Sequence, residues 1–339
     1  MQRLSRAFSN KVLTKMKGMI GVMKFHAGPG LPKKSKLRQL LLDVDRGRQL
    51  YLLMMLPVAY ILIFKYQPMY GALIAFKDFD PTAGIWGSTW VGLKHFVRFI
   101  EQPKFFQMVS NTLMLALWDS IIGFPVPILL ALALNNVAHK KYKSFVQTVT
   151  YAPHFISTVV IVGMLTQLLH PRMGALNLLF QHFGVPAVSY LGKAGYFRPV
   201  YTLSGVWQNA GWGSIIYLAA LSSVDVELHQ AAQIDGASIV QRTRHIDLPA
   251  IMPSIIILLI LRIGSLMNVG FEKVFLMQNQ LNLTTSEVIS TYVYKMGIMS
   301  QFPDYSYATA IGLFNSVVNV VLLVIVNTTA KKASETSLW

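Results

Sequence analysis

The sequence contains no cysteine, which excludes disulfide bonds, thiolate metal sites and a cysteine nucleophile. Charged residues are scarce as well. They make up 13% of the 339 residues, whereas a soluble domain carries about 25%. Hydrophobic residues, by contrast, make up 53% of the chain. This balance argues against an ordinary soluble domain and indicates a membrane protein.

The sequence also lacks the short motifs that accompany catalysis or nucleotide binding. There is no G-x-x-x-x-G-K-[ST] run, and Gly192-Lys193 has neither the upstream glycine nor the following hydroxyl residue. H-E-x-x-H and G-x-S-x-G are absent, and the histidines show no metal-ligand spacing. We therefore expect a chain that is not an enzyme and that holds no cofactor or metal of its own.

The positive charge is concentrated at the N-terminus. Of the 30 lysines and arginines, 12 lie before residue 49, against only Asp43 and Asp45. Beside an apolar run, such a segment favours the anionic cytoplasmic leaflet, with about 1 kcal/mol for each basic residue near the surface. A solvated tail explains residues 1–35 equally well. We predict a basic cytoplasmic extension over residues 1–48, contact with membrane lipid, and no nucleic-acid partner.

Six apolar runs approach the length of about 20 residues that a membrane-spanning helix needs. The sequence therefore predicts an all-α, multi-pass membrane protein with six transmembrane helices. Glycine and proline weaken the second run at Gly123, Pro125 and Pro127, and proline at membrane depth frees backbone carbonyls that need protein or water partners. The runs are about Leu50–Phe64 (extending towards Phe76), Phe106–Leu134, Phe145–Leu169, Val200–Leu221, Ala250–Val269 and Tyr307–Val326.

Lysine and arginine placement predicts the orientation of these runs. With the N-terminus inside, the cytoplasmic pieces carry 19 of the 30 basic residues, and His139–Lys143 is the clearest short loop among them. Six spans return the C-terminus to the cytoplasm. The segments Pro171–Pro199 and Phe271–Tyr305 are then extracytoplasmic, and within the second we expect Gln278–Thr285 to be a hydrated loop.

A polar stretch, Asp225–Pro253, lies between the fourth and fifth runs and faces the cytoplasm in this orientation. Asp225 is a suitable N-cap, and small residues recur at helical spacing, so one helix face has little bulk. Gly236 allows a sharp bend. A second short helix is expected over about Ala237–His245, ended by Leu248-Pro249. An ordinary cytoplasmic hairpin explains these features equally well.

This stretch resembles the EAA loop of the membrane subunits of ABC importers, which reads E-A-A, three residues, G, nine residues, then I-x-L-P. The matching residues are Gln230, Ala231, Ala232, Gly236, Ile246, Leu248 and Pro249. Asp235-Gly236-Ala237 is similar to the sugar-importer branch. The resemblance implies that these residues contact the ATPase, although Gln230 replaces the usual glutamate that can pair with an ATPase arginine.

Residues 49–339 as a whole resemble oligosaccharide and polysaccharide permeases of the LplB type. The resemblance implies a MetI-like, type I importer core over about residues 105–330 with the coupling loop at 225–253. It also implies a bacterial cytoplasmic-membrane location, a second homologous permease as heterodimer partner, two ATPase subunits that bind ATP, an extracytoplasmic solute-binding protein and an oligosaccharide cargo. The segments that carry it are Phe64–Gly71, Ile74–Asp78, Tyr196–Pro199, Gly211–Tyr217 and Ser337–Trp339.

Two charged residues, Asp119 and Arg262, fall within apolar runs. Such groups usually face a bundle interior or a water-filled cavity, so we hypothesise that one or both line the translocation path, as a pair. A snorkelling side chain at a misplaced helix end explains Arg262 equally well. Four further polar residues can supply hydrogen bonds to a sugar or make ordinary helix–helix contacts. They are Asn111, Gln208, Asn209 and Tyr217.

Two other classes of function compete with an ATP-driven importer. An ion-coupled secondary sugar carrier needs no ATPase and tolerates disruption of residues 225–253. A membrane anchor or sensor has no transport role. An adjacent gene for an ATPase or a solute-binding protein, or vanadate-sensitive uptake in vesicles, separates an ATP-driven importer from both alternatives.

Overall fold

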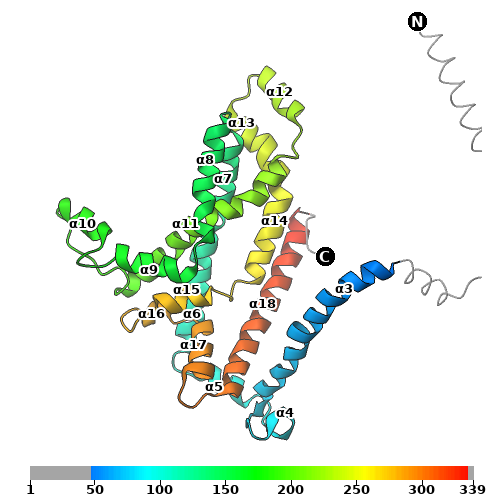
Figure 1. The fold of residues 1–339 in the computed structure, drawn as a ribbon, viewed down its shortest axis with the longest axis vertical. Coiled ribbons are helices and arrows are strands. Elements are labelled where there is room, and N and C mark those ends of the chain that lie inside the picture. Colours follow the sequence, from blue (N-terminus) through cyan, green and yellow to red (C-terminus); the bar gives the residue numbers. More distant parts are fainter. Residues whose placement is uncertain (1–46, 335–339) are drawn as a thin grey trace, which may run out of the picture. The chain divides into compact units, whose positions relative to one another are not determined.

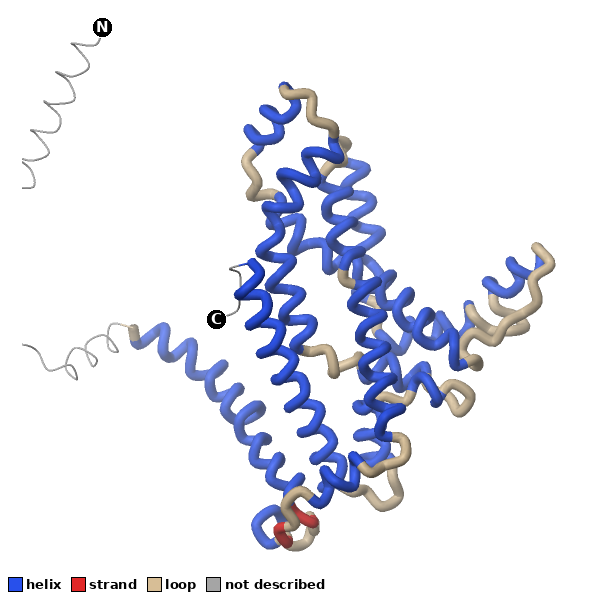
Figure 2. The backbone as a smooth tube through the Cα atoms, turned by 180° about the vertical axis from the view of Figure 1, so that it is seen from behind, coloured by secondary structure: helices blue, strands red, loops and turns tan. Residues whose placement is uncertain are grey.

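The computed structural model describes residues 47–334, and these are almost entirely helical (Figures 1 and 2). The predicted N-terminal extension and the Ser337–Trp339 match lie outside the described residues, apart from positions 47 and 48. The chain divides into two units between Pro68 and Met69. The described strands are β1 (Lys77–Asp78) and β2 (Thr89–Trp90), which form one antiparallel pair.

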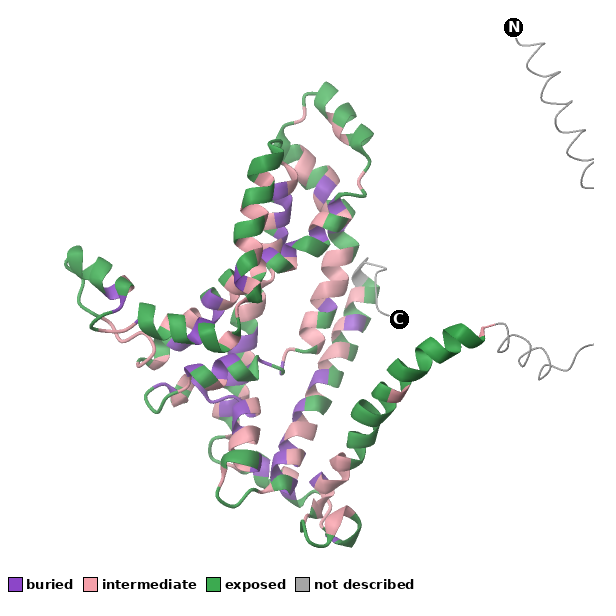
Figure 3. Ribbon diagram, in the orientation of Figure 1, coloured by how far each residue is buried: buried purple, intermediate pink, exposed green. Residues whose placement is uncertain are grey.

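The first unit contains the start of a long apolar helical run. Helix α3 (Arg48–Ile61) continues through a wider π-helical turn, η1 (Leu62–Tyr66), into the 3₁₀ segment η2 (Gln67–Phe76). The run from Arg48 to Phe76 has 29 residues, which is enough to span a bilayer. None of the α3 side chains is buried (Figure 3), so their apolar surface requires lipid or another protein around it.

The second apolar run forms α6 (Phe105–Trp118), η3 (Asp119–Gly123) and α7 (Pro125–Asn135). Together they make a helical path of 31 residues from Phe105 to Asn135. The π-helical turn η3 lies where glycine and two prolines were expected to weaken the helix. A proline has no N–H to donate, and a widened turn beside it lets the neighbouring carbonyls find other partners.

The third run is not one straight helix. It forms α8 (Lys140–Tyr151), η4 (Ala152–Phe155) and α9 (Thr158–Leu168), with a bend of 100° at the break. Pro153 starts the 3₁₀ turn, and the Ser157 hydroxyl accepts a hydrogen bond from the backbone N–H of Val160. This serine cap starts a new helix in a new direction. A short helix, α10 (Ala175–His182), follows.

Helix α11 (Ala194–Leu221) is the fourth run and packs against both α7 and α8. Its 28 residues correspond to a length of about 42 Å. Glycine permits the close packing. A Cβ atom at Gly211 would collide with the Thr150 carbonyl of α8, and one at Gly213 would lie 3.1 Å from Pro127 of α7.

The polar stretch and the fifth run form α12 (Val226–Ile234), α13 (Ile239–Arg242), η5 (Thr243–Asp247) and α14 (Leu248–Gly264). The expectation that Leu248-Pro249 ends the second short helix is wrong. The helix runs without interruption from Ile239 to Gly264, a length of 26 residues. The π-helical turn η5 ends two residues before Pro249, and such a widened turn lets the carbonyls left without the proline's N–H find other partners.

After α14 the chain is irregular until α15 (Phe271–Met277), which is followed by α16 (Leu283–Ser286) and α17 (Ile289–Tyr294). The expected hydrated loop is only partly exposed. Asn282 is fully buried and donates to the carbonyls of Leu191 (2.9 Å) and Met277 (3.0 Å). Buried backbone carbonyls need donors, and this asparagine supplies two bonds at once.

The last helix, α18 (Tyr305–Ser334), follows the turn η6 (Lys295–Met299). Within residues 47–334, four helical runs are long and apolar enough to cross a membrane, or five if the bent pair counts as one span. Figure 1 shows α12 at the opposite end of the bundle from α17. The short helices α4 (Gly84–Gly87) and α5 (Lys94–Ile100) lie at that second end as well.

The close packing of α8 and α11 at Gly211 leads to a prediction about stability. We expect Gly211→Ala to lower the free energy of unfolding by about 1–3 kcal/mol, because the methyl group forces α8 and α11 apart. Gly312→Ala on α18 is the matched control, since no heavy atom lies within 4 Å of a Cβ there. That variant should be neutral or gain up to about 1 kcal/mol from helix propensity. Thermal unfolding of the purified protein in detergent compares the two, and equal midpoints would contradict this account.

Candidate functional site

The stretch between α11 and α14 forms a rigid corner. The Asp225 side chain accepts from the Glu227 N–H (2.9 Å) and caps the start of α12. Gly236 ends α12 with a φ of +77°, which glycine adopts without strain, and the Ala237 N–H donates to the Ala232 carbonyl (2.8 Å). A capping box, in which Ser238 and Gln241 satisfy each other's backbone N–H groups, then starts α13. Both helix ends are thus closed by local hydrogen bonds.

The residues that match the EAA pattern lie mostly on the surface of this corner. Gln230, Ala231, Asp235 and Gly236 are exposed, and Ala232, Ala237, Ile246 and Leu248 are half-buried, while Pro249 is exposed. Large apolar side chains are exposed beside them, with Ile234 at 87% and Val240 at 75%. Exposed apolar side chains of this kind are typical of surfaces that contact another protein or a membrane.

A fully buried carboxylate, Asp247, joins this corner to the bundle. Its Oδ1 accepts from Asn135 Nδ2 at the end of α7 (3.2 Å) and lies 3.2 Å from His229 Nε2 of α12. Asn136 adds a second tie by donating to the Thr243 hydroxyl (3.0 Å). Sequence reasoning missed these residues because Asn135 and Asp247 are far apart in the chain.

Asp119 of η3 and Arg262 of α14 lie in direct contact. Arg262 Nη2 donates to both Asp119 Oδ2 (2.5 Å) and the Asp119 carbonyl (2.7 Å). Both side chains are partly exposed, at 31% for Arg262 and 39% for Asp119. They line a cavity of about 120 Å³, which we call the polar cavity. Its other lining residues are Ala116, Ser120, Tyr201, Ser265, Leu266, Asn268, Val269 and Gly270.

The irregular backbone between α14 and α15 forms one wall of the polar cavity. Two asparagines of α18 hold it. Asn319 Oδ1 accepts from the Met267 N–H (2.9 Å), and Asn268 Oδ1 accepts from Asn315 Nδ2 (3.1 Å) and Asn319 Nδ2 (3.2 Å). Non-helical backbone at membrane depth is tolerated only where protein or water supplies hydrogen bonds, and here protein does.

A second cation, Lys273 of α15, lies close to this pair and was missed because the sequence placed it in an outer loop. The residue is 7% exposed, and its Nζ donates to the Tyr201 carbonyl (3.2 Å). A Cβ atom on Gly205 would lie 3.5 Å from Lys273 Nζ and 3.8 Å from Asp119 Oδ1, so both charges border the same glycine. The signal in the sequence that could have placed Lys273 near the pair was its position, only four residues beyond the fifth apolar run.

An aromatic cluster lies at the bend between η4 and α9. The rings of His154 and Trp212 stack with centroids 4.7 Å apart and planes 5° apart, and Phe155 meets Trp212 edge-on at 5.7 Å. His154 Nδ1 lies 3.1 Å from Asn209 Oδ1. The other predicted amide, Gln208, donates to the Ile156 carbonyl (3.3 Å). Partly exposed aromatic faces next to an amide suit a sugar ring, which has apolar faces and hydroxyl edges.

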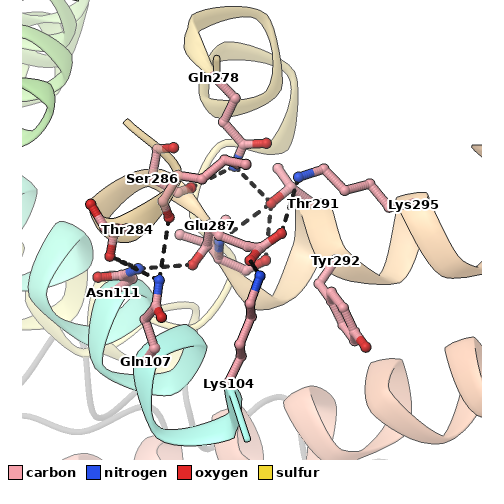
Figure 4. Close-up of polar contacts among 12 residues, drawn as sticks. Lys104, Gln107, Asn111, Gln278, Thr284, Ser286, Glu287, Thr291, Tyr292 and Lys295 are labelled. Atoms are coloured by element: carbon pink, nitrogen blue, oxygen red, sulfur yellow. Dashed lines mark hydrogen bonds and ion pairs between the residues drawn. The ribbon is translucent and has the colours of Figure 1, made fainter. Parts of the chain in front are cut away.

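Two predicted residues lie away from the polar cavity. Tyr217 is buried in an apolar cluster with Leu221 and Ile251. Asn111 is buried as well, and its amide donates to the carbonyls of Thr284 (3.0 Å) and Glu287 (3.1 Å) while its oxygen accepts from Arg198 (3.0 Å). The structure thus gives Asn111 the contacts of a residue that fastens α6 to the segment around α16 (Figure 4).

Figure 4 also shows the charged side chains of Glu287, Lys295 and Lys104 around α16 and α17. Glu287 is buried, and its carboxylate lies 3.1 Å from Lys295 Nζ and 3.7 Å from Lys104 Nζ. Gln278 donates to the Ser286 carbonyl (2.6 Å). A buried carboxylate is stable when cations and donors surround it, so this network holds α6, α16 and α17 together rather than leaving a free charge.

The helices, the polar cavity and the exposed corner together indicate a class of protein. The chain is a multi-pass helical membrane protein with a polar cavity between its helices and an exposed, rigid corner at one end of the bundle. Residues 123–334 match the family described as "Binding-protein-dependent transport system inner membrane component". The chain belongs to this family, with a MetI-like fold, and is a transport subunit of the inner membrane.

Two curated relatives from Bacillus subtilis (strain 168) cover most of the chain. Protein LplB is 46% identical over 296 residues, covering 87% of this chain and 92% of the relative. The polygalacturonan/rhamnogalacturonan transport system permease protein YteP is 44% identical over 307 residues, covering 91% and 95% respectively.

Two solved structures have the same fold. One is a bacterial ABC transporter involved in the import of the acidic polysaccharide alginate, with a TM-score of 0.80 and 38% identity over 87% of this chain and 99% of the other. The second is a bacterial alginate ABC transporter in complex with alginate pentasaccharide-bound periplasmic protein. It has a TM-score of 0.81 and 37% identity over 88% of this chain and 100% of the other.

The hydrogen bond from the Met267 N–H to Asn319 in the wall of the polar cavity leads to a second stability prediction. We expect Asn319→Leu to cost about 1–3 kcal/mol of stability, because it leaves the buried Met267 N–H without an acceptor. Ser316→Leu on the exposed side of the same helix is the control, since its hydroxyl bonds only within α18. Thermal unfolding in detergent should separate the two variants by several degrees. A control that unfolds as early as Asn319→Leu would show that α18 responds to any polar-to-apolar change.

Proposed function

We propose that the chain is the membrane-spanning permease subunit of an ATP-driven importer and that its cargo is an oligosaccharide. The observation that carries this proposal is the exposed corner at residues 225–253, which has the EAA pattern and is joined to helices that line the polar cavity. The names of YteP and of the alginate transporters support a saccharide cargo.

The proposed architecture has six spans with both termini in the cytoplasm. The bent pair α8–α9 and the long helix α11 then each count as one span, in addition to the four apolar runs. We propose a basic extension over residues 1–48, a permease domain over 49–339 with its core at about 105–330, and a coupling loop at 225–253. The basic residues near α8 and at Lys331 and Lys332 support this orientation.

The proposed assembly has a second homologous permease as heterodimer partner, two ATPase subunits that bind the ATP, and an extracytoplasmic solute-binding protein. The chain itself uses no cofactor, metal or nucleic acid and contacts membrane lipid. The exposed apolar side chains Ile234 and Val240 support a protein partner at the corner, because burial of such groups drives association.

The proposed coupling relies on one continuous helix. The run from Ile239 to Gly264 has 26 residues, or about 39 Å, and carries the corner at one end and Arg262 at the other. A push on the corner by an ATPase therefore moves Arg262 relative to Asp119. A partner can bias two states only through contacts that differ between them, and the Asp119–Arg262 pair is a contact of this kind.

We propose that the cargo contacts the aromatic cluster of His154, Phe155 and Trp212 together with Asn209. Trp212 is 47% exposed, and the cluster lies at the break in the third run. The apolar face of a sugar ring can stack on the indole while Asn209 bonds a hydroxyl. Asp119 and Arg262 remain the proposed lining of the path. For Asn111 and Tyr217, whose contacts are with other parts of this chain, we propose that they hold the helices around the path in place.

Disruption of the corner tests the coupling proposal. We expect Gly236→Trp to leave the protein inserted and assembled but to reduce ATP-dependent sugar uptake into vesicles by at least about tenfold. The bulky side chain and a φ of +77° both disturb the small-residue face. Gly184→Trp is the matched control, because Gly184 has the same φ of +77° and equally open surroundings but lies outside the loop.

Normal uptake in Gly236→Trp with the ATPase still bound would contradict the coupling role. Uptake that continues without any ATPase, driven by an ion gradient, would instead support a secondary sugar carrier.

Replacement of the exposed tryptophan tests the proposed sugar contact. We expect Trp212→Ala to raise the cargo concentration for half-maximal uptake by about three- to tenfold, the range expected for loss of one aromatic stacking contact. Trp207→Ala is the control, since Trp207 has a similar exposure on the same helix but lines an apolar groove. If both variants shift uptake equally, the cluster is not a specific contact.

A further inference from the structure

The polar cavity has more positive than negative charge around it. Asp119 contributes one negative charge, whereas Arg262 lines the cavity and Lys273 borders Gly205 together with Asp119. Glu272 precedes Lys273 but is exposed and does not line the cavity. The cluster therefore has an excess of one cation at membrane depth, where an uncompensated charge is costly.

Arg262 also has unused hydrogen-bonding capacity. Its Nη2 makes both bonds to Asp119, and within the described part of the chain Nε and Nη1 have no hydrogen-bond partner. A guanidinium group presents its donors in a planar fork that matches the two oxygens of a carboxylate. Ser265 and Asn268 lie on the same wall and add polar atoms around the fork.

Contacts with Tyr201 fix the Lys273 ammonium group near the cavity. Its Nζ donates to the Tyr201 carbonyl, lies 5.2 Å from the centre of the Tyr201 ring, and forms no ion pair among the described residues. A carbonyl and an aromatic face stabilise an ammonium group without neutralising it. Lys273 is therefore a cation beside the cavity without an ion-pair partner among the described residues, and its positive potential favours an anion there.

We propose that the polar cavity binds a carboxylate group of the cargo and that the cargo is therefore an acidic oligosaccharide that contains uronic acid units. This inference rests on the proposed function and names its substrate class. A volume of about 120 Å³ accommodates a carboxylate with the adjoining part of one ring, not a whole disaccharide. Each acidic unit would then pass Arg262 in turn.

The relatives support the same chemistry. YteP is named for polygalacturonan and rhamnogalacturonan, and the two structural neighbours for alginate, which is described as an acidic polysaccharide. Polygalacturonan is a polymer of sugar acids. Asp119 competes with such a carboxylate for Arg262, so the same pair that holds the arginine in place also permits release of the cargo.

The test uses the complete complex in proteoliposomes, with the second permease, the ATPase and the solute-binding protein of the proposed assembly. The acidic probes are trigalacturonate and trimannuronate. The matched neutral probes are their methyl esters, which keep the ring stereochemistry and add only one methyl group to each carboxyl. We expect ATP-dependent uptake of at least one acid to exceed that of its ester by about tenfold or more, as for a charge-assisted hydrogen bond.

Variants assign this preference to the permease rather than to the binding protein. Lys273→Met should lower the ratio of acid to ester uptake by about tenfold, whereas Asp119→Asn, which removes the negative charge, should maintain or raise it. Lys295→Met is the control, because that lysine pairs with Glu287 and does not line the polar cavity, so it should leave the ratio unchanged. The ratio within one preparation is independent of the amount of assembled complex.

Uptake of the esters but not of the acids would overturn the acidic-cargo inference and leave the importer function intact. Uptake of neither acid would also overturn it, and ATP-dependent uptake of a neutral sugar by the same vesicles would show that the importer function survives. An acid preference that is unchanged in Lys273→Met would overturn the role given to the cavity charge. If a variant does not assemble, the comparison of acid and ester in the unaltered complex still decides the cargo class.

Discussion

A hydrocarbon environment offers no hydrogen bonds, so every polar group at membrane depth must find its partner within the protein. The fold around the polar cavity follows from this constraint. Irregular backbone separates α14 from α15, and asparagines of α18 hydrogen-bond to this segment. Arg262 likewise bonds to the widened turn at Asp119 as well as to its carboxylate. Broken helices are stable here because each break has a specific partner.

The same constraint links the two ends of the molecule. Asp247 is fully buried and accepts a hydrogen bond from Asn135, so the corner cannot shift without disturbing the end of α7. Arg262 lies on the helix that begins at the corner, whereas Asp119 lies on the path that ends at Asn135. The two helical paths that meet at Asp247 therefore meet again at the Asp119–Arg262 pair. Relative motion of these paths changes both contacts together.

Much of the helical layout could be predicted from the sequence because apolar runs and basic loops are local signals. The runs correspond to helices of the structure, and the small residues with Gly236 indicated the corner. The bend after Pro153 and the continuity through Pro249 could not be predicted, because both depend on turns whose width is set by tertiary contacts. Lys273 shows the limit most clearly. Its local sequence is polar enough for an outer loop, and only packing against Tyr201 buries it.

The glutamine at position 230 fits the surface on which it lies. A carboxylate there would offer an ion pair to a partner, and an exposed ion pair contributes little, about 0–1 kcal/mol. The corner instead exposes Ile234, Val240 and other apolar side chains around the small-residue face. Burial of one such side chain contributes about 1.5–3 kcal/mol, which exceeds the loss of the charge. Under the proposed function, contact with the ATPase thus depends on apolar burial and shape, and a hydrogen bond from Gln230 is sufficient to orient it.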